Sequence, residues 1–146
     1  MTEHNQNNNT AILLVEDDDL DAVSVKRALT KLNTNNPIYR AKDGIQGLEL
    51  MRSELSGRPF VILLDLNMPK MNGLAMLKEL REDPKLSHNI VYVLTTSNRE
   101  QDKASAYQHH IAGYFLKSTL NHNYSELGSM LNQYLQINEP PVQHVN

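Results

Sequence analysis

Hydrophobic residues in this chain gather in short runs that are separated by longer segments of mixed polarity. The strongest runs are Ala11–Val15, Phe60–Leu64 and Ile90–Leu94, and weaker ones are Ile38–Ala41 and Gly113–Leu116. The strong runs are continuously apolar, which is typical of strands whose two faces are both buried. The pattern therefore predicts an α/β fold, in which helices connect the strands of a doubly wound parallel sheet and cover both of its faces.

Between the runs, apolar residues recur at helical spacing and predict amphipathic helices. The residues expected to face the sheet are Ala22, Val25, Ala28, Leu29 and Leu32 in the first helix, Ile45, Leu48, Met51 and Leu55 in the second, Leu74, Met76, Leu77 and Leu80 in the third, and Tyr124, Leu127, Met130, Leu131, Tyr134 and Leu135 in the last. The segment Glu100–His110 offers only Ala104 and Tyr107. We therefore expect this fourth helix to be held weakly.

Two helix starts carry the spacing of a capping box, in which the first side chain accepts a hydrogen bond from a helix amide and a second side chain, three residues later, accepts one from the backbone amide of the first residue. Asp43 with Gln46 precedes the second helix, and Ser97 with Glu100 precedes the fourth. The spacing predicts that Asp43 and Ser97 cap these helices.

Length and composition limit the classes of protein to which this chain can belong. The 146 residues suffice for one domain with its own core. We expect this domain to span residues 11–136, between an Asn-rich disordered tail at 1–10 and a short polar tail at 137–146. Cysteine is absent, which excludes disulfides and thiolate zinc sites.

Charge and hydropathy exclude further classes. No apolar run approaches the roughly 20 residues of a membrane span, and the first residues lack the basic and apolar regions of a secretory signal. We therefore expect a cytoplasmic protein that does not enter a membrane. The formal net charge is −3 and no basic block is present, which argues against a nucleic-acid binder. Any output should pass through contacts with other proteins.

Polar side chains follow the ends of four predicted strands. They are Glu16 and Asp17, Asp65, Thr95 and Thr96, and Lys117. Because the carboxyl ends of parallel strands meet at one edge of a sheet, these groups should converge. Clustered carboxylates repel one another by roughly 4 kcal/mol per pair at 4 Å and an effective dielectric of about 20. The cluster therefore favours a hard divalent cation such as Mg2+, which prefers oxygen ligands.

Asp65 is the best candidate for a nucleophile. A carboxylate beside Mg2+ and a lysine can accept a phosphoryl group, because the two cations neutralise the transferring oxygens. Asn67, two positions later, can offer its backbone carbonyl to the metal, and Thr95 can donate a hydroxyl. Lys117 would complete the charge balance.

These residues resemble those of a known family, the receiver domains of two-component response regulators. The likeness covers roughly Ala11 to Leu135, and its order and spacing make it strong although each motif alone is weak. The motifs are Leu14-Val15-Glu16-Asp17, Leu64-Asp65-Leu66-Asn67-Met68-Pro69, Asn72-Gly73, Leu94-Thr95-Thr96 and Gly113-Tyr114-Phe115-Leu116-Lys117. The resemblance implies a flavodoxin-like fold of five parallel strands in the order 2-1-3-4-5 with five helices.

The resemblance also implies a role for each site residue. Asp65 would accept phosphate from a partner sensor histidine kinase, assisted by Thr95 and Lys117, and Thr95 with Tyr114 would switch the surface of the fourth helix and fifth strand. The implied Mg2+ surround is Glu16, acting through water, together with Asp17, Asp65 and the backbone carbonyl of Asn67. Such a protein is a signalling domain rather than an enzyme, since it catalyses only its own phosphotransfer and dephosphorylation.

The sequence departs from the commonest receiver pattern at two positions. Glu16 stands where aspartate is usual, which lengthens one metal-binding carboxylate, and Ser118 stands where the family has a proline that usually follows a cis bond. A cis bond before a residue other than proline costs about 2.5–4 kcal/mol, so we predict a trans Lys117–Ser118 bond and a shifted loop.

The polar loop 118–123 and the Lys117-Ser118 pair resemble the small stand-alone regulators paired with bacterial phytochrome kinases. The expected partner is therefore a histidine kinase of the bacteriophytochrome class. Receivers often dimerise through the fourth helix, fifth strand and fifth helix, and this implies a possible homodimer here.

Some of these residues also have simpler interpretations. Asp18 and Asp19 are best explained as acids at a helix start, where the helix dipole favours them. Tyr114 could serve packing alone, because aromatic residues commonly fill strand positions. His109 and His110 fit a surface pair at a helix end better than a metal site.

Two other functions remain open from the sequence. An acid-phosphatase-like hydrolase also uses a strand-end aspartate and Mg2+, but such enzymes usually need a second aspartate two residues later as the general acid. Asn67 occupies that position and cannot shuttle the proton. The third alternative is an adaptor that is never phosphorylated and retains a vestigial pocket.

Overall fold

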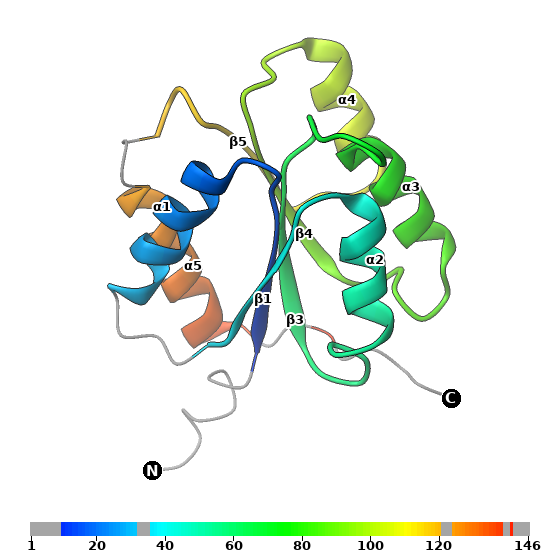
Figure 1. Ribbon diagram of the computed structural model, residues 1–146, viewed down its shortest axis with the longest axis horizontal. Coiled ribbons are helices and arrows are strands. Elements are labelled where there is room, and N and C mark those ends of the chain that lie inside the picture. The colour runs from blue at the N-terminus through cyan, green and yellow to red at the C-terminus, as the bar shows by residue number, and fades with distance from the viewer. Residues whose placement is uncertain (1–9, 32–35, 121–123, 139–140, 142–146) are drawn as a thin grey trace.

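A computed structural model describes residues 10–31, 36–120, 124–138 and 141. Strands and helices alternate along these residues (Figure 1). The strands are β1 (Ala11–Val15), β2 (Ile38–Ala41), β3 (Phe60–Leu64), β4 (Ile90–Thr95) and β5 (Gly113–Leu116), and the helices are α1 (Asp19–Thr30), α2 (Gly44–Arg52), α3 (Gly73–Glu82), α4 (Glu100–Gln108) and α5 (Ser125–Ile137). All strand pairs are parallel and the order is β2-β1-β3-β4-β5, which confirms the expected topology.

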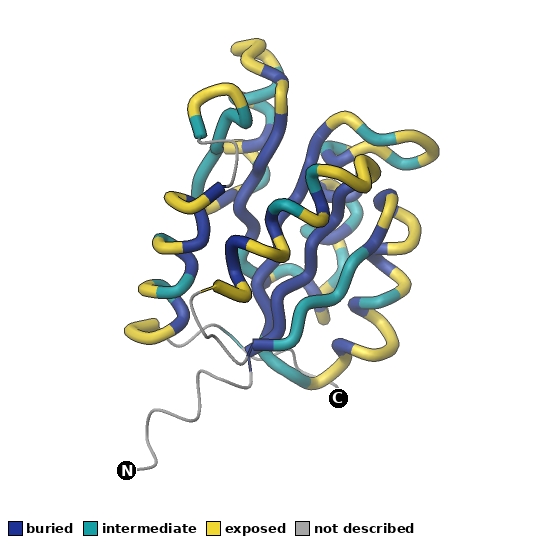
Figure 2. Tube along the Cα trace, turned by 60° about the vertical axis from the view of Figure 1, so that its left-hand side comes forward, coloured by how far each residue is buried: buried dark blue, intermediate teal, exposed yellow. Residues whose placement is uncertain are grey.

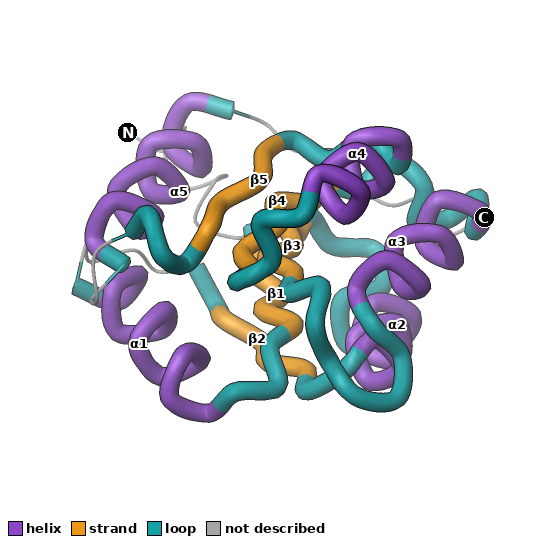
Figure 3. The backbone as a smooth tube through the Cα atoms, turned by 90° about the horizontal axis from the view of Figure 1, so that it is seen from above, coloured by secondary structure: helices purple, strands orange, loops and turns teal. Residues whose placement is uncertain are grey.

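The sheet is the middle of three layers. Helices α1 and α5 cover one face, and α2, α3 and α4 cover the other (Figures 1 and 3). Successive residues of β3 point to opposite faces: Ile62 belongs to the core under α2 and α3, whereas Leu63 belongs to the core under α1 and α5. The central strands β1 and β3 are buried throughout, while β5 at the edge is half-buried, as Figure 2 shows.

The predicted apolar stripes of α1, α2, α3 and α5 are largely correct, with one exception in α2. In α1 the residues Ala22, Val25, Ala28 and Leu29 are buried, whereas the predicted Leu32 lies outside the described residues. Ile45 was expected to face the core but is 46% exposed. The inward face of this short helix is formed by Gly44, Gly47, Leu48 and Met51, and Ile45 is rotated off it.

Helix α4 differs from the prediction in its buried residue and in its start. Ala104 is exposed and Tyr107 is 48% exposed, so both predictions are wrong, and Ala106 is the buried residue instead. Ser97 does not cap the helix, because α4 begins after Arg99 without a side-chain cap. Asp43, in contrast, caps α2 as predicted by accepting a 2.9 Å hydrogen bond from the Gln46 amide.

The far end of α4 is held by a residue of α3. The Arg81 guanidinium donates to four backbone carbonyls: those of His109 at 2.7 Å and His110 at 3.0 Å, just beyond α4, and those of Ser87 and Asn89, each at 2.8 Å, before β4. Arg81 therefore ties the end of α4 to α3 and to the entry of β4.

The predicted tails lie mostly outside the described residues, which begin at Thr10. Helix α5 ends at Ile137, the first residue of the expected polar tail. Within the described part of the chain, no helix is both long and apolar enough to cross a membrane.

Candidate functional site

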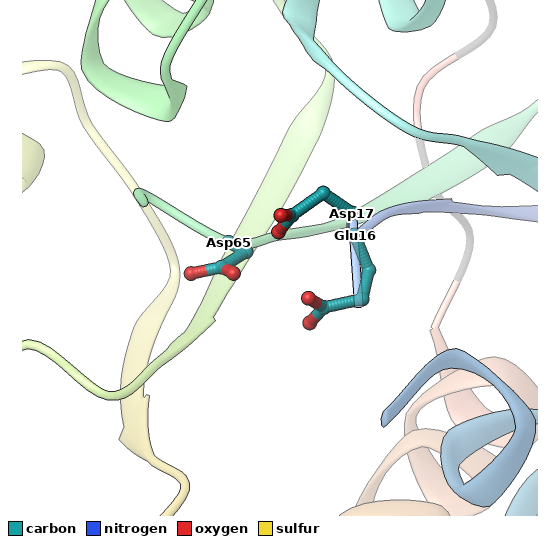
Figure 4. A group of neighbouring side chains, drawn as sticks. All are labelled: Glu16, Asp17 and Asp65. Atoms are coloured by element: carbon teal, nitrogen blue, oxygen red, sulfur yellow. The ribbon is translucent and has the colours of Figure 1, made fainter. Parts of the chain in front are cut away.

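The acids predicted from the sequence meet at the carboxyl edge of the sheet. Val15 of β1 pairs with Leu64 of β3, so the residues that follow them, Glu16 and Asp65, leave the sheet side by side. The Asp65 amide donates to the Val15 carbonyl at 3.0 Å and extends this pairing by one residue. Carboxylate oxygens of Glu16, Asp17 and Asp65 lie within 4.8 Å of one another (Figure 4).

Asp65 is nearly buried and is held from its own loop. Its side chain is 6% exposed, and its Oδ1 accepts a 3.1 Å hydrogen bond from the Asn67 amide. Gly73 at the start of α3 passes directly behind it, where a Cβ atom would lie 2.5 Å from the Asp65 carbonyl oxygen. The loop between β3 and α3 therefore fixes Asp65 through backbone contacts.

Glu16 is the most buried acid of the group. Its side chain is 1% exposed, and it accepts hydrogen bonds from the Asp18 amide at 3.1 Å and from Lys117 at 2.8 Å. Burial raises the pKa of Glu16 to about 7, the bond from Lys117 opposes this shift, and the charge of Asp65 adds to it. Lys117 and the Asp18 amide therefore compensate the buried Glu16 carboxylate only in part, and a further cation beside it would be favourable.

Lys117 follows β5 and reaches the same acids. Its Nζ lies 2.8 Å from Glu16 Oε1, 2.7 Å from Asp21 Oδ2 and 3.6 Å from Asp65 Oδ2. Burial alone would lower the pKa of Lys117, but its hydrogen bonds to Asp21 and Glu16 outweigh that cost and raise the pKa above its usual value. Lys117 therefore stays charged and neutralises part of the cluster.

The three acids fit a magnesium ion that keeps water in its shell. Magnesium binds oxygen at about 2.1 Å in an octahedron, so oxygens on opposite sides of one ion lie about 4.2 Å apart. The 4.8 Å spread of the carboxylate oxygens is slightly wider. The three carboxylates are therefore close enough to share one ion, directly or through water in its shell.

Ser97 joins the two residues expected to switch. Thr95 is fully buried, and its Oγ1 accepts a 3.3 Å hydrogen bond from the Ser97 amide. The Tyr114 hydroxyl donates to the Ser97 carbonyl at 2.7 Å, and the Ser97 hydroxyl donates to Asp102 of α4 at 2.5 Å. Burial raises the pKa of Tyr114 above its usual value, so its hydroxyl keeps the proton that it donates. Thr95, Tyr114 and α4 thus meet at one residue.

The remaining predicted residues lie near the same edge. Asn67 is exposed beside Asp65, to which its amide donates. No peptide bond in the described part of the chain is cis, so the Lys117–Ser118 bond is trans as expected. Asp18 accepts from the Asp21 amide as the N-cap of α1, and Asp19 lies in the first turn, which agrees with their interpretation as helix-start acids.

Sequence reasoning missed three residues of this network: Asp21, Asp102 and Tyr124. Asp21 lies in the first turn of α1, directly beyond the acidic residues that follow β1, and this short separation could have placed it near the same edge. The hydroxyl of Tyr124 donates to Asp21 at 3.1 Å across 103 positions in the chain. No local pattern signals that contact, because it depends on the path between β5 and α5.

Comparison with known proteins identifies the family. The family described as "Response regulator receiver domain" matches residues 12–127. The response regulator Rcp1 of Synechocystis sp. is 37% identical over 111 residues, which are 73% of this chain and 76% of Rcp1. The crystal structure of Mn2+-bound Rcp1 superposes with a TM-score of 0.80 at 31% identity, covering 90% of this chain and 99% of that one.

A second solved structure is similar to the same extent. The phosphorylated cyanobacterial phytochrome response regulator RcpA superposes with a TM-score of 0.79 at 28% identity, covering 92% of this chain and 98% of that one. The family match runs from β1 into α5 and so includes the whole carboxyl edge of the sheet. This chain therefore belongs to the response regulator receiver domains of two-component systems.

Proposed function

We propose that this protein is a phosphorylation switch in which Asp65 accepts a phosphoryl group from a partner histidine kinase. The observation that carries the proposal is the meeting of Glu16, Asp17 and Asp65 from two strands beside the charged Lys117. The family supplies the coarser part of the function, the receiver role in a two-component system. The roles of Asp65 as phosphoacceptor and of Thr95 and Lys117 as assisting residues are part of the proposal.

The proposed transfer needs a nucleophile, charge compensation and a fixed geometry. A carboxylate oxygen of Asp65 forms a bond to phosphorus, and the bond between phosphorus and the kinase histidine nitrogen breaks, with its electron pair passing to that nitrogen. Lys117, 3.6 Å from Asp65, neutralises charge on the transferred oxygens, and the Asn67 amide keeps the Asp65 carboxylate oriented. Thr95 offers its hydroxyl at the neighbouring strand end.

Glu16, Asp17, Asp65 and the Asn67 carbonyl are the proposed holders of Mg2+, and the observed spread of the carboxylates supports this role. When bound, Mg2+ supplies positive charge that stabilises the transferring phosphoryl group. The crystal structure of Rcp1 in a Mn2+-bound form supports a divalent cation as a ligand of this protein as well.

The proposed output is a change in the surface formed by α4 and β5. Ser97 connects Thr95, beside the pocket, to Tyr114 of β5 and to Asp102 of α4. A phosphoryl group that draws the Thr95 hydroxyl would therefore disturb both contacts of Ser97. The same surface, together with α5, is our proposed homodimer interface.

We also propose a bacteriophytochrome histidine kinase as the partner. RcpA is described as a phytochrome response regulator, and it shares this fold over almost its whole length. The Lys117-Ser118 pair and the polar loop after it support the same assignment.

Phosphorylation by acetyl phosphate tests the assignment of Asp65. With Mg2+, the wild-type protein should gain one phosphate by intact-mass spectrometry, and Asp65→Asn should gain none, because the amide is not a nucleophile. Asp19→Asn is the matched control, since Asp19 is exposed in the same acidic region and should label like wild type. Equal labelling of the Asp65→Asn protein would defeat the proposal.

A further inference from the structure

Lys117 is held more closely by an acid outside the proposed metal surround than by the proposed phosphoacceptor. Its Nζ lies 2.7 Å from Asp21 Oδ2 and 2.8 Å from Glu16 Oε1, but 3.6 Å from Asp65 Oδ2. Asp21 belongs to the first turn of α1, and Lys117 lies 96 positions later, after β5. The fold therefore brings these two residues together at one side of the pocket.

Tyr124 fixes the other oxygen of Asp21. Its hydroxyl donates to Asp21 Oδ1 at 3.1 Å, so each carboxylate oxygen of Asp21 has its own donor. The Tyr124 ring is 6% exposed and packs in the core between α1 and α5. Burial, followed by the charge of Asp21, raises the pKa of Tyr124 to about 12, so the phenol remains a donor at physiological pH.

The backbone at Tyr124 supports a specific role for this contact. Tyr124 has φ 55° and ψ 29°, the left-handed region that residues other than glycine seldom adopt. The chain accepts this conformation just before α5, where it directs the ring inward and the hydroxyl to Asp21. A strained position that is held by surrounding structure is often part of a functional constraint.

We infer that Asp21 and Tyr124 are positioning residues, which hold the Lys117 ammonium on the Glu16 side of the pocket so that Asp65 and Asp17 stay open to a divalent cation. This inference rests on the proposed function of those acids. Without Asp21, the close carboxylate partners of Lys117 in the described chain are Glu16 and Asp65, two of the proposed metal holders. The ammonium would then compete with the cation for the same oxygens.

Magnesium affinity of the unphosphorylated full chain tests this inference by isothermal titration calorimetry. Asp21→Asn should weaken Mg2+ binding by about tenfold, the size expected for losing one hydrogen bond between charged groups. Asp19→Asn removes the same charge from the same helix turn, but Asp19 is exposed and pairs with Arg40, so its effect should stay below about twofold.

Tyr124→Phe tests the positioning of Lys117 without changing the charge of the site, because it removes one hydroxyl and no charged group. It should weaken Mg2+ binding by about two- to threefold, as expected for one hydrogen bond of about 0.5 kcal/mol. The double variant Asp21→Asn with Tyr124→Phe should bind no more weakly than Asp21→Asn alone. Tyr134→Phe is the matched control, because Tyr134 packs in the same core from α5 and makes an edge contact with Tyr92.

A spectroscopic signal reports on Lys117 directly. The ammonium resonance of Lys117 in a proton–nitrogen NMR spectrum should move in Asp21→Asn and in Tyr124→Phe, and should be unchanged in both controls. Equal Mg2+ affinities for Asp21→Asn and Asp19→Asn, or additive effects of Tyr124→Phe and Asp21→Asn, would overturn the inference. Because no phosphoryl donor is present, such a failure is distinct from a failure of Asp65 to accept phosphate.

Discussion

At the scale of single residues, the position of Asp65 depends on a glycine eight residues later. A Cβ on Gly73 would lie 2.5 Å from the Asp65 carbonyl oxygen and 2.7 Å from Leu66 Cα, and backbone atoms cannot move aside as a flexible side chain can. The Gly73 amide also donates to the Leu66 carbonyl at 3.0 Å, which closes the loop behind the proposed phosphoacceptor. The close contact between Gly73 and the backbone of Asp65 and Leu66 therefore both packs the start of α3 and holds Asp65 in the site.

Gly73→Ala should lower the free energy of unfolding by about 3 kcal/mol, because overpacking against the backbone forces a shift of the loop. Urea denaturation measures this. Gly47→Ala is the control, since its Cβ would meet side-chain atoms, of Met76 at 3.2 Å and of Val15 at 3.3 Å, rather than backbone. Alanine favours the helix by about 0.5–1 kcal/mol over glycine, so the net change there should lie near zero. Equal losses for the two variants would contradict the close contact at Asp65.

The site residues that could be predicted are those whose place follows from the end of a strand. Asp65 directly follows the buried strand β3 and Lys117 follows the half-buried strand β5, and the parallel sheet then determines that they meet. Asp21 and Tyr124 were missed because their contact depends on the rotation of α1 and on the left-handed turn before α5. Local patterns in the sequence predict neither the rotation of α1 nor the left-handed conformation of Tyr124.

At the scale of elements, the strands β1, β3 and β4 were predictable because their apolar runs are continuous and buried, whereas short helices were less predictable. Helix α2 buries two glycines, which add no hydrophobicity to the inward face, so Ile45 seemed to belong to it. Helix α4 buries only Ala106 in the described chain. Its sequence has too few apolar residues to predict which side of the helix faces the sheet. Its start has no side-chain cap, while Arg81 holds the backbone beyond its end. We therefore expect α4 to move mainly at its start, next to Ser97.

Arg81→Gln should release the end of α4. Amide hydrogen exchange from Gln108 to Ile111 should become at least about tenfold faster, since the variant loses donors to carbonyls that the guanidinium now satisfies. Arg52→Gln is the control, because Arg52 makes exposed ion pairs with Glu79 and Asp83, which contribute about 0–1 kcal/mol. Unchanged exchange at this end of α4 in the Arg81 variant would contradict the proposed anchor.

At the scale of the whole molecule, the sheet brings strand ends from distant parts of the chain to one edge. The acids after β1, the acid after β3 and the lysine after β5 come together because all the strands run in one direction. Helices α1 and α5 cover one face and meet beside the pocket through Asp21 and Tyr124, and α4 lies on the other face next to Ser97. A change of charge at Asp65 is therefore close to contacts on both faces of the sheet.

The central claim is that Glu16, Asp17 and Asp65 share one divalent cation next to the oxygen of Asp65 that takes the phosphoryl group. The most direct measurement is a crystal structure grown with Mn2+ and beryllofluoride, a mimic of the phosphoryl group, with an anomalous difference map at the manganese edge. We predict one anomalous peak among these three carboxylates and beryllofluoride density joined to Asp65, with Lys117 beside it. A peak elsewhere, or an Asp65 side chain without the added group, would contradict the account.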